Sequence, residues 1–357
     1  MVEQRPVRVG VIGANYGAAT HLPAYAALSE FEVVAVATGH IEGARAAADR
    51  FGVERAYGDY RDLCRDDDVD LVDVVTRPRL HEPMVLAAVE AGRHVLCEAP
   101  LAGTAAEAER MLSATRRAGV RGFVDMQSRF STGLRELRRR VREGWIGRVE
   151  NVRASAFYPT FTRPEAVRSS LWCADAANGA DSLRVHGLHT LDLIRWMFGE
   201  VADTAVRTAT LRPAWPGEDG PVPASSADSS AMIGRLADGA VFSLHTSWVA
   251  RHGGGWTLEA YGDEGVLRAS ATGHTGHFPV TVTGARHDDP AEARLAPDPD
   301  DGVGVGGITD GSPNHALAGL LTAVARDLRT GAADPDVPTF ADGVRLLRVA
   351  EAGAQES

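Results

Sequence analysis

Five short apolar segments alternate with helical stretches in the first third of the chain, and this alternation constrains the fold more than any other feature. The apolar segments are residues 7–12, 33–37, 69–75, 94–97 and 122–126. Stretches with helical character, such as 43–51 and 84–91, lie between them. Strands that alternate with helices form right-handed crossovers and a parallel sheet covered on both faces. We therefore expect a doubly wound α/β domain over residues 1–124.

After about residue 148 the pattern changes to strand-like segments in close succession. These segments are residues 149–157, 204–211, 230–236, 240–248, 256–261 and 265–271. A chain of 357 residues exceeds the roughly 250 to 300 residues that one core usually supports. We therefore expect a second, α+β domain over residues 125–357 with a large, mostly antiparallel open sheet. Residues 212–226 and 284–314 are expected to be irregular, with little order around 298–310, and helices are expected at 316–329 and 342–350.

The composition limits the possible partners. The formal net charge is -11, and all 37 basic residues are arginine because the sequence contains no lysine. So acidic a chain is not expected to bind nucleic acid or an anionic membrane, which require clustered cations. The three cysteines, Cys64, Cys97 and Cys173, have neither disulfide nor metal-site spacing. No segment approaches the roughly 18 apolar residues of a membrane span. We expect a cytoplasmic protein with a small-molecule substrate and no metal.

A glycine-containing turn follows the first apolar segment and precedes a helix expected at residues 19–28. It reads Gly13-Ala14-Asn15-Tyr16-Gly17-Ala18 and keeps the first glycine of the dinucleotide-binding pattern Gly-x-Gly-x-x-Gly. That glycine makes the tight turn, and small residues after it let the backbone approach a pyrophosphate. Asn15 replaces the second glycine, where asparagine tolerates a left-handed backbone. The turn therefore predicts a dinucleotide site formed by Gly13, Asn15, Tyr16, Gly17 and Ala18.

The end of the second apolar segment indicates which dinucleotide is bound. An acidic residue at this point normally binds the ribose hydroxyls of NAD, but this chain has Thr38-Gly39-His40, with Arg45 shortly after. Without the acid a 2′-phosphate is not repelled, and hydroxyl, imidazole and guanidinium groups can bind it. We expect NADP or NAD as the cofactor and favour NADP. In the alternative interpretation, His40 and Arg45 are simply exposed.

Three stretches, in this order, resemble the Gfo/Idh/MocA family of nicotinamide-dependent oxidoreductases. They are the turn at residues 13–18, Glu98-Ala99-Pro100, and the polar run 178–192. The family usually has lysine where this chain has Ala99, and Asp-x-Gly-x-His where this chain has Val185-His186-Gly187-Leu188-His189. The lysine and aspartate that normally transfer protons are both missing. In this respect the chain is similar to the branch that includes the Gal80-type transcriptional co-regulators.

The resemblance implies further cofactor contacts and an assembly. The implied contacts are Thr76, Pro78 and His81 beneath the nicotinamide ribose, Glu98 on the ribose or nicotinamide side, and Gln127 beside the cofactor or substrate. His21 stands where the family places a His-x-x-Ala sequence. In this family the face of the second-domain sheet mediates dimers or tetramers. A homodimer or homotetramer is therefore expected.

Histidine is the remaining candidate for proton transfer. Hydride transfer at a carbon that bears oxygen requires a group that gives or takes a proton at that oxygen. His189 keeps its place in the motif, and an imidazole titrates near neutral pH. In a helix over residues 187–198, Asp192 would lie one turn away and could orient His189. His186 and Arg184 are further candidates, although His186 could instead face the core.

Three functions are compatible with these residues. The first is an NAD(P)-dependent oxidoreductase acting on a sugar-like or other small hydroxy or carbonyl compound, with His189 as acid–base. The second is a non-redox lyase, isomerase or cyclase that uses the same pocket, since the usual hydride-transfer partners are missing. The third is a nucleotide-sensing regulator without turnover. The fold alone does not decide among them, because function depends on the site.

Overall fold

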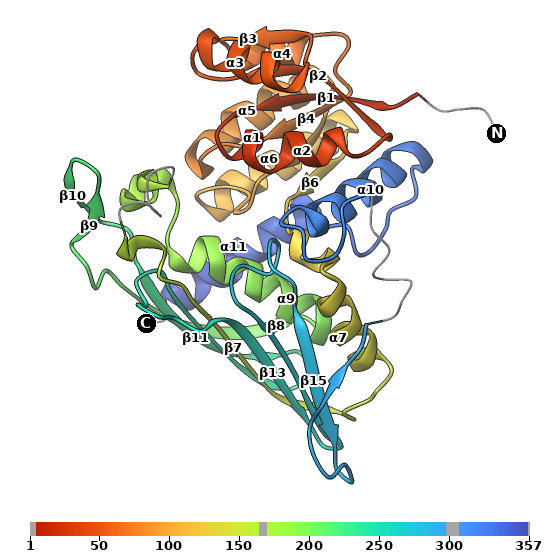
Figure 1. Cartoon of the computed structure of the whole chain (residues 1–357), viewed down its shortest axis with the longest axis vertical. Helices are drawn as coiled ribbons and strands as arrows, with labels where there is room; N and C mark the ends of the chain where they lie inside the picture. Colours follow the sequence, from red (N-terminus) through yellow and green to blue (C-terminus); the bar gives the residue numbers. More distant parts are fainter. Residues whose placement is uncertain (1–4, 164–169, 298–306, 356–357) are drawn as a thin grey trace. The chain divides into compact units, whose positions relative to one another are not determined.

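The computed structural model describes residues 5–163, 170–297 and 307–355, and its chain forms two compact units (Figure 1). The first unit contains the residues up to Gln127 together with Pro313–Val344. The second contains most of the chain from Ser128 onward, and Arg345–Ser357. The chain thus returns to its first unit near the end, a return that the expected boundary after residue 124 did not include. Among the described residues, no helix has the length and apolar character needed to cross a membrane.

The first unit is built on a six-stranded sheet in the order β3-β2-β1-β4-β5-β6, and every adjacent pair is parallel. All four residues of β4 are buried, as expected for a strand covered on both faces. The predicted doubly wound fold is confirmed. The elements are β1 (Val7–Ile12), α1 (Tyr16–Ala19), α2 (His21–Ala26), β2 (Phe31–Ala37), α3 (Ile41–Phe51), β3 (Arg55–Tyr57), α4 (Tyr60–Arg65), β4 (Leu71–Val74), α5 (Pro78–Glu90), β5 (His94–Cys97), α6 (Ala105–Ala118), β6 (Gly122–Val124) and α10 (His315–Thr330).

The second unit is built on an eight-stranded sheet in the order β16-β15-β14-β13-β7-β12-β11-β8. Its pairs are antiparallel except β7 with β12, which are parallel. The mostly antiparallel sheet that the sequence predicts is confirmed. The strands are β7 (Val149–Phe157), β8 (Val201–Ala209), β11 (Ser229–Leu236), β12 (Val241–Ser247), β13 (Gly255–Gly262), β14 (Gly265–Ala271), β15 (Thr281–Arg286) and β16 (Ala293–Leu295).

Helices α7 (Thr132–Arg142) and α9 (Leu188–Phe198) pack against this sheet (Figure 1). Residues of β11 alternate between buried and exposed, so one face of the sheet supports the core and the other is open. A π-helical turn, η5 (Leu183–Gly187), leads directly into α9. Short 3-10 turns complete the unit: η1 (Gln127–Phe130), η2 (Thr160–Thr162), η3 (Leu171–Ala174) and η4 (Ala176–Asn178). Helix α11 (Phe340–Gln355) ends the described chain.

Two segments expected to be irregular contain strands, and one segment expected to be a single helix is divided, so these three expectations were wrong. Residues 212–226 contain a β-hairpin, β9 (Ala214–Gly217) with β10 (Gly220–Pro223), and residues 284–314 contain strand β16. The expected helix at 19–28 is two short helices, because Thr20 has φ −128° and interrupts the helical backbone. Most of the stretch 298–310 lies outside the described residues.

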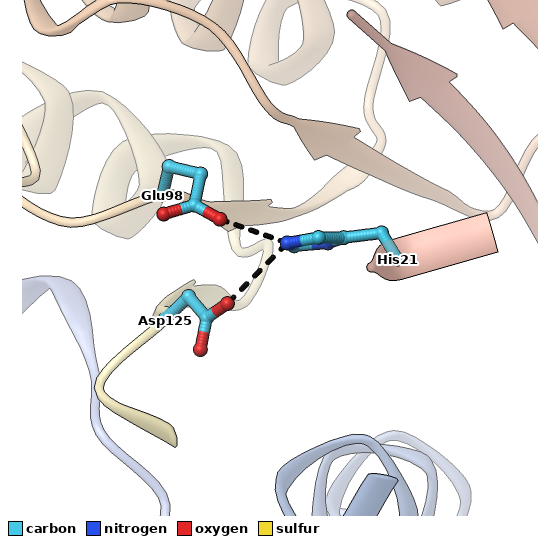
Figure 2. A group of neighbouring side chains, drawn as sticks. All are labelled: His21, Glu98 and Asp125. Carbon is cyan, nitrogen blue, oxygen red and sulfur yellow. Dashed lines mark hydrogen bonds and ion pairs between the residues drawn. The ribbon is translucent and has the colours of Figure 1, made fainter. Parts of the chain in front are cut away.

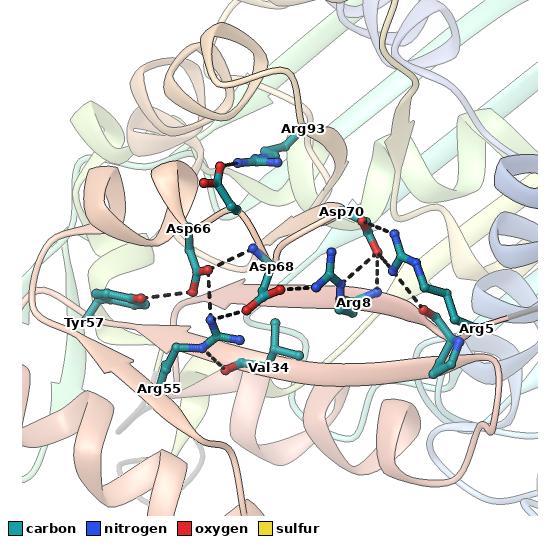
Figure 3. Close-up of polar contacts among 11 residues, drawn as sticks. Arg5, Arg8, Val34, Arg55, Tyr57, Asp66, Asp68, Asp70 and Arg93 are labelled. Atoms are coloured by element: carbon teal, nitrogen blue, oxygen red, sulfur yellow. Dashed lines mark hydrogen bonds and ion pairs between the residues drawn. The ribbon is translucent and has the colours of Figure 1, made fainter.

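Arginine–aspartate pairs link the strands of the first unit at the end of the sheet where β1 and β4 begin (Figure 3). Arg5 pairs with Asp70 at 2.7 Å, and Arg55 pairs with Asp66 at 3.0 Å and Asp68 at 2.9 Å. Arg8 also pairs with Asp68. Partly exposed pairs of this kind contribute only about 0 to 1 kcal/mol each. They therefore add modestly to a fold held chiefly by its buried strands.

Candidate functional site

The turn after β1 has the geometry of a tight glycine turn. Gly13 has φ +108°, and its N–H donates to the Ala37 carbonyl at 2.9 Å. A Cβ at this position would lie 2.0 Å from the Val75 carbonyl oxygen, so only glycine fits. Gly17 and Ala18 are buried behind the turn. Asn15 has φ −79° and a right-handed backbone, so the turn does not use the left-handed conformation that asparagine tolerates. Tyr16, which begins α1, leaves 40% of its surface exposed.

The candidate 2′-phosphate residues lie together after β2. The Thr38 hydroxyl donates to the His40 carbonyl at 2.6 Å, which fixes the loop. His40 has an extended backbone and precedes the first residue of α3, and Arg45 is exposed within that helix. Both His40 and Arg45 are exposed. Their assignment to the cofactor stays a prediction.

His81 and its neighbours make backbone contacts within the first unit. Pro78 is the first residue of α5, and the Thr76 hydroxyl donates to the Met84 sulfur at 3.4 Å. The buried His81 ring lies 3.0 Å from the Thr76 carbonyl and 3.1 Å from the Leu101 carbonyl. Burial lowers the pKa of His81 despite these two carbonyls. The ring therefore ties the turn after β4 to the loop after β5.

Four titratable side chains meet: His21 from the start of α2, and Asp73, Glu98 and Asp125 from the carboxyl ends of β4, β5 and β6 (Figure 2 draws three of them). The buried His21 donates through Nδ1 to Asp73 at 2.8 Å and through Nε2 to Glu98 at 2.8 Å. Asp125 Oδ2 lies 3.5 Å from His21 Nε2. Burial opposes a charged imidazole, but Asp73 and Glu98 outweigh it and raise the pKa of His21 well above its ordinary value. The sequence pointed to Glu98 only as a cofactor contact, which stays a prediction, and to His21 only as part of a short motif; Asp73 and Asp125 were not predicted.

Four histidines gather in the second unit, two of them from the predicted motif. The rings of His189 and His274 are 4.5 Å apart, and His274 lies 5.7 Å from His186 and 5.5 Å from His277. His186 Nδ1 accepts the indole N–H of Trp248 at 2.7 Å, so it is the neutral tautomer with its proton on Nε2. This His186–His189–His274–His277 group is called the histidine cluster below.

Burial and mutual repulsion keep two of these rings neutral. Burial, helped by neighbouring His189 and His277, lowers the pKa of His186 to about 3. Burial and the three other imidazoles lower the pKa of His274 well below its ordinary value. His274 and His277 were not predicted from the sequence. Their signal was the polar run Gly273-His274-Thr275-Gly276-His277 directly after a predicted strand.

Asp192, the expected partner of His189, is bound by an arginine. Both oxygens of the buried Asp192 accept hydrogen bonds from Arg129, at 2.7 Å and 2.5 Å. A guanidinium carries a permanent charge and matches a carboxylate with two parallel donors, so it binds Asp192 better than an imidazole would. Arg184 is likewise paired with Asp181, which also accepts the Arg184 backbone N–H at 2.8 Å. These two predicted residues therefore make ion pairs within the second unit.

Gln127 ends the first unit beside the carboxylate cluster. Its backbone N–H donates to Asp125 Oδ1 at 3.2 Å. The next residue, Ser128, forms a hydroxyl bond of 2.8 Å with Thr275, and both of these belong to the second unit. That bond anchors the loop that carries His274.

Comparisons with known proteins agree with this architecture. Residues 7–126 match a family model described as an oxidoreductase family with an NAD-binding Rossmann fold. The levoglucosan dehydrogenase of Pseudarthrobacter phenanthrenivorans is 29% identical over 284 residues, 73% of each chain. The myo-inositol 2-dehydrogenase of Thermotoga maritima is 27% identical over 271 residues, 74% of this chain and 75% of the relative. A solved levoglucosan dehydrogenase with NADH and levoglucosan has a TM-score of 0.86 at 25% identity, covering 99% of this chain and 98% of that chain.

A second model of the same family, the GFO/IDH/MocA C-terminal domain, matches residues 134–268. The two models share one family, follow each other along the chain in the order of its two units, and together match well over half of it. The protein therefore belongs to the Gfo/Idh/MocA family.

Proposed function

We propose that the protein is an NAD(P)-dependent dehydrogenase acting on a hydroxyl group, or the matching carbonyl, of a sugar-like or other small polyhydroxylated compound. Relatives named for levoglucosan, D-apiose and myo-inositol support this substrate class. The observation that carries the proposal is the histidine cluster. It offers proton-transfer groups in a chain that has no lysine and has valine in place of the motif aspartate.

The first unit would hold the cofactor, which supplies the hydride acceptor when bound. Gly13 gives the close backbone turn that a pyrophosphate requires, because no side chain fits there. The carboxyl ends of the parallel strands carry Glu98, in keeping with the place where open α/β sheets bind ligands. We favour NADP because Thr38, His40 and Arg45 replace the usual acid. The NADH complexes of a relative keep NAD as the alternative.

His189 would transfer the proton. His186 and His274 are held neutral, so they can lie close to a third imidazole without adding a fixed positive charge. During alcohol oxidation His189 would take the hydroxyl proton as the hydride leaves the carbon. In the reverse direction it would return that proton to the alkoxide. His186, anchored by Trp248, is positioned to donate a hydrogen bond from Nε2.

The test is turnover with defined sugars. Purified protein is incubated with NAD⁺ or NADP⁺ and levoglucosan, D-apiose or myo-inositol, and absorbance at 340 nm is followed. Reduction of the cofactor with at least one polyol supports the proposal. Binding of NADH or NADPH, followed by its fluorescence, is measured separately. If neither NADH nor NADPH binds, the cofactor assignment itself is contradicted.

A non-redox activity is the second candidate, favoured by one specific observation. Ala99 and Val185 remove both usual proton-transfer groups, while Arg184, His186 and His189 remain together on η5 and α9. A lyase, isomerase or cyclase would change the sugar without a net change at 340 nm, which product analysis by mass spectrometry detects. Nucleotide binding with no turnover would instead favour a sensing regulator of the Gal80-like branch.

Assembly is part of the proposal. We infer a homodimer or homotetramer formed through the open face of the eight-stranded sheet, where Ile233 and Val241 leave 61% and 49% of their surfaces exposed. Apolar groups of this size at a sheet face favour coverage by a partner. Light scattering at micromolar concentration distinguishes an oligomer from a monomer.

A further inference from the structure

The carboxylate cluster around His21 brings three carboxyl groups and one imidazole together. Asp73 and Asp125 are fully buried, and the Glu98 side chain is only 14% exposed. Even a protonated His21 offers one positive charge to three carboxylates. Buried carboxylates require a compensating cation or proton, because desolvation penalises an uncompensated charge.

Three donor atoms of this cluster converge on one point (Figure 2). His21 Nε2, one Glu98 oxygen and one Asp125 oxygen all lie within 4.8 Å of one another. His21 Nε2 is 2.8 Å from Glu98 Oε1 and 3.5 Å from Asp125 Oδ2. Tetrahedral zinc with bonds of about 2.0 to 2.1 Å places its ligand atoms roughly 3.3 Å apart. The observed separations lie a few tenths of an ångström on either side of that spacing.

Each of the three side chains is held from behind by its other polar atom. His21 Nδ1 bonds to Asp73 at 2.8 Å. Glu98 Oε2 accepts the Ala99 backbone N–H at 3.2 Å, and Asp125 Oδ1 accepts the Gln127 backbone N–H at 3.2 Å. A carboxylate behind a histidine is the usual arrangement at metal centres, where it fixes the tautomer and the ring orientation. The inward-facing atoms are therefore oriented before any ligand binds.

Asp125 supplies a second, independent indication that the cluster binds a ligand. Its Oδ2 atom is fully buried and accepts no hydrogen bond within the described part of the chain. It points toward His21 Nε2 from the end of β6 (Figure 2). A buried carboxylate oxygen without a donor is unusual, because buried polar atoms are nearly always satisfied.

We propose that His21, Glu98 and Asp125 form a binding site for one divalent transition-metal ion of the zinc class, with Asp73 orienting His21. One imidazole nitrogen with two carboxylate oxygens suits zinc, manganese or iron, whereas magnesium and calcium prefer oxygen ligands alone. Three protein ligands leave a fourth position for water or a ligand oxygen. The partly exposed Glu98 is the member of the set that solvent reaches. The alternative occupant is a proton on His21 Nε2, shared with the carboxylates.

The test is zinc binding without any nucleotide, so its outcome is separate from that of the proposed function. Protein stripped with a chelator is titrated with ZnCl₂ in competition with a fluorescent zinc indicator. We expect one equivalent to bind. Asp73→Asn should weaken binding by about 10- to 100-fold, as expected for loss of a supporting carboxylate, and Asp125→Asn or His21→Gln should weaken it further.

The histidine cluster provides the matched control. His186→Gln/His274→Gln removes two imidazoles from the second unit and should leave zinc affinity unchanged. Loss of zinc binding in this double variant with retention in Asp125→Asn would overturn the proposal. So would the absence of a bound equivalent in the wild type, which would assign the cluster to a proton.

X-ray absorption of the zinc-loaded wild type keeps the test decisive if a variant fails to fold. One imidazole nitrogen and two or more oxygens in the coordination shell support the site at His21. Several imidazoles would place the ion elsewhere and contradict it. Circular dichroism of the metal-free variants shows which of them can be compared with the wild type.

Discussion

Trp248 donates its indole N–H to His186 Nδ1 over 2.7 Å. The bond joins the end of the β12 segment to the π-helical turn before α9. Trp248 also packs against Phe161, with ring centres 5.1 Å apart, within the apolar cluster of the second unit. The tautomer of His186 is thus fixed by a residue that belongs to the core. The packing of Trp248 in the core and the protonation of His186 are therefore coupled.

Trp248→Phe tests that coupling. The change leaves a buried ring nitrogen without its donor, which typically costs about 1 to 3 kcal/mol. It should also raise the pKa of His186, because the neutral form loses its hydrogen bond. Urea unfolding and ¹⁵N chemical shifts of His186 measure the two effects. Trp256→Phe is the matched control, since Trp256 donates to Thr190 rather than to a histidine. A His186 spectrum unchanged by Trp248→Phe would contradict the prediction.

Stability should fall as the pH decreases below the ordinary histidine range. Burial lowers the pKa of His186 to about 3 in the folded chain, against about 6.5 in the unfolded chain, so between these pH values the unfolded state binds one more proton. The pKa of His274 is lowered in the same direction. For each proton that only the unfolded state binds, the free energy of unfolding falls by about 1.4 kcal/mol per pH unit as the pH decreases.

His186→Gln/His274→Gln should flatten this slope. Part of it should remain, because burial also lowers the pKa values of His81 and His94 in the first unit. Urea unfolding from pH 7 to pH 4 measures the slope. Equal slopes in the wild type and the double variant would show that these rings are not the source.

Gly13→Ala should abolish dinucleotide binding. The new Cβ would lie 2.0 Å from the Val75 carbonyl, at a φ of +108°. Such strain costs about 1 to 3 kcal/mol even before the overlap is relieved. Gly254→Ala, in the second unit, is the matched control, because a Cβ there would meet no other atom within 4 Å. NADH and NADPH fluorescence titrations, with thermal melting, measure both variants. Wild-type affinity in Gly13→Ala would remove this turn from the cofactor site.

The elements that the sequence predicted well are those with a strong local pattern. Strand β5 at His94–Cys97 and strand β7 at Val149–Phe157 have the predicted bounds. Continuous burial gives β5 a run of apolar residues, and the alternation of faces gives β7 an alternating pattern. The β9–β10 hairpin was missed because its proline and glycine content is typical of loops. There Trp215 is fully buried and stacks on Phe161, so tertiary packing overrides local propensity.

Long-range pairing was the least predictable part of the candidate site. Helical spacing placed Asp192 near His189, but Arg129 comes from 63 positions earlier in the chain and takes both oxygens. His21 was recognised only as part of a short motif, and its partner Asp73 lies inside a predicted apolar strand. A buried aspartate in such a strand is a usable signal, because it requires a partner.

His40→Ala and Arg45→Ala should weaken NADP⁺ binding selectively. Both side chains are exposed beside the loop after β2, where a 2′-phosphate would find a charge-assisted partner. The dissociation constant for NADP⁺ should rise by about 10-fold per lost contact, at roughly 1.4 kcal/mol each, while that for NAD⁺ stays the same. Arg50→Ala, in the last turn of the same helix, is the control for a change in net charge. Equal effects on both nucleotides would remove these residues from the specificity assignment.

His189→Gln should nearly abolish turnover while leaving cofactor affinity unchanged. The loss of a general acid or base typically reduces the rate by about 10² to 10⁴, and glutamine keeps a polar side chain at this buried position of α9. His287→Gln, at the exposed residue directly after β15, is the matched control and should retain full activity. Steady-state kcat at 340 nm, together with NADH or NADPH titration, measures the two effects separately. Asp192→Asn should mainly lower stability, because it breaks the buried pair with Arg129. Retained activity in His189→Gln, with loss in His186→Gln or His274→Gln, would transfer the acid–base role to another ring of the histidine cluster.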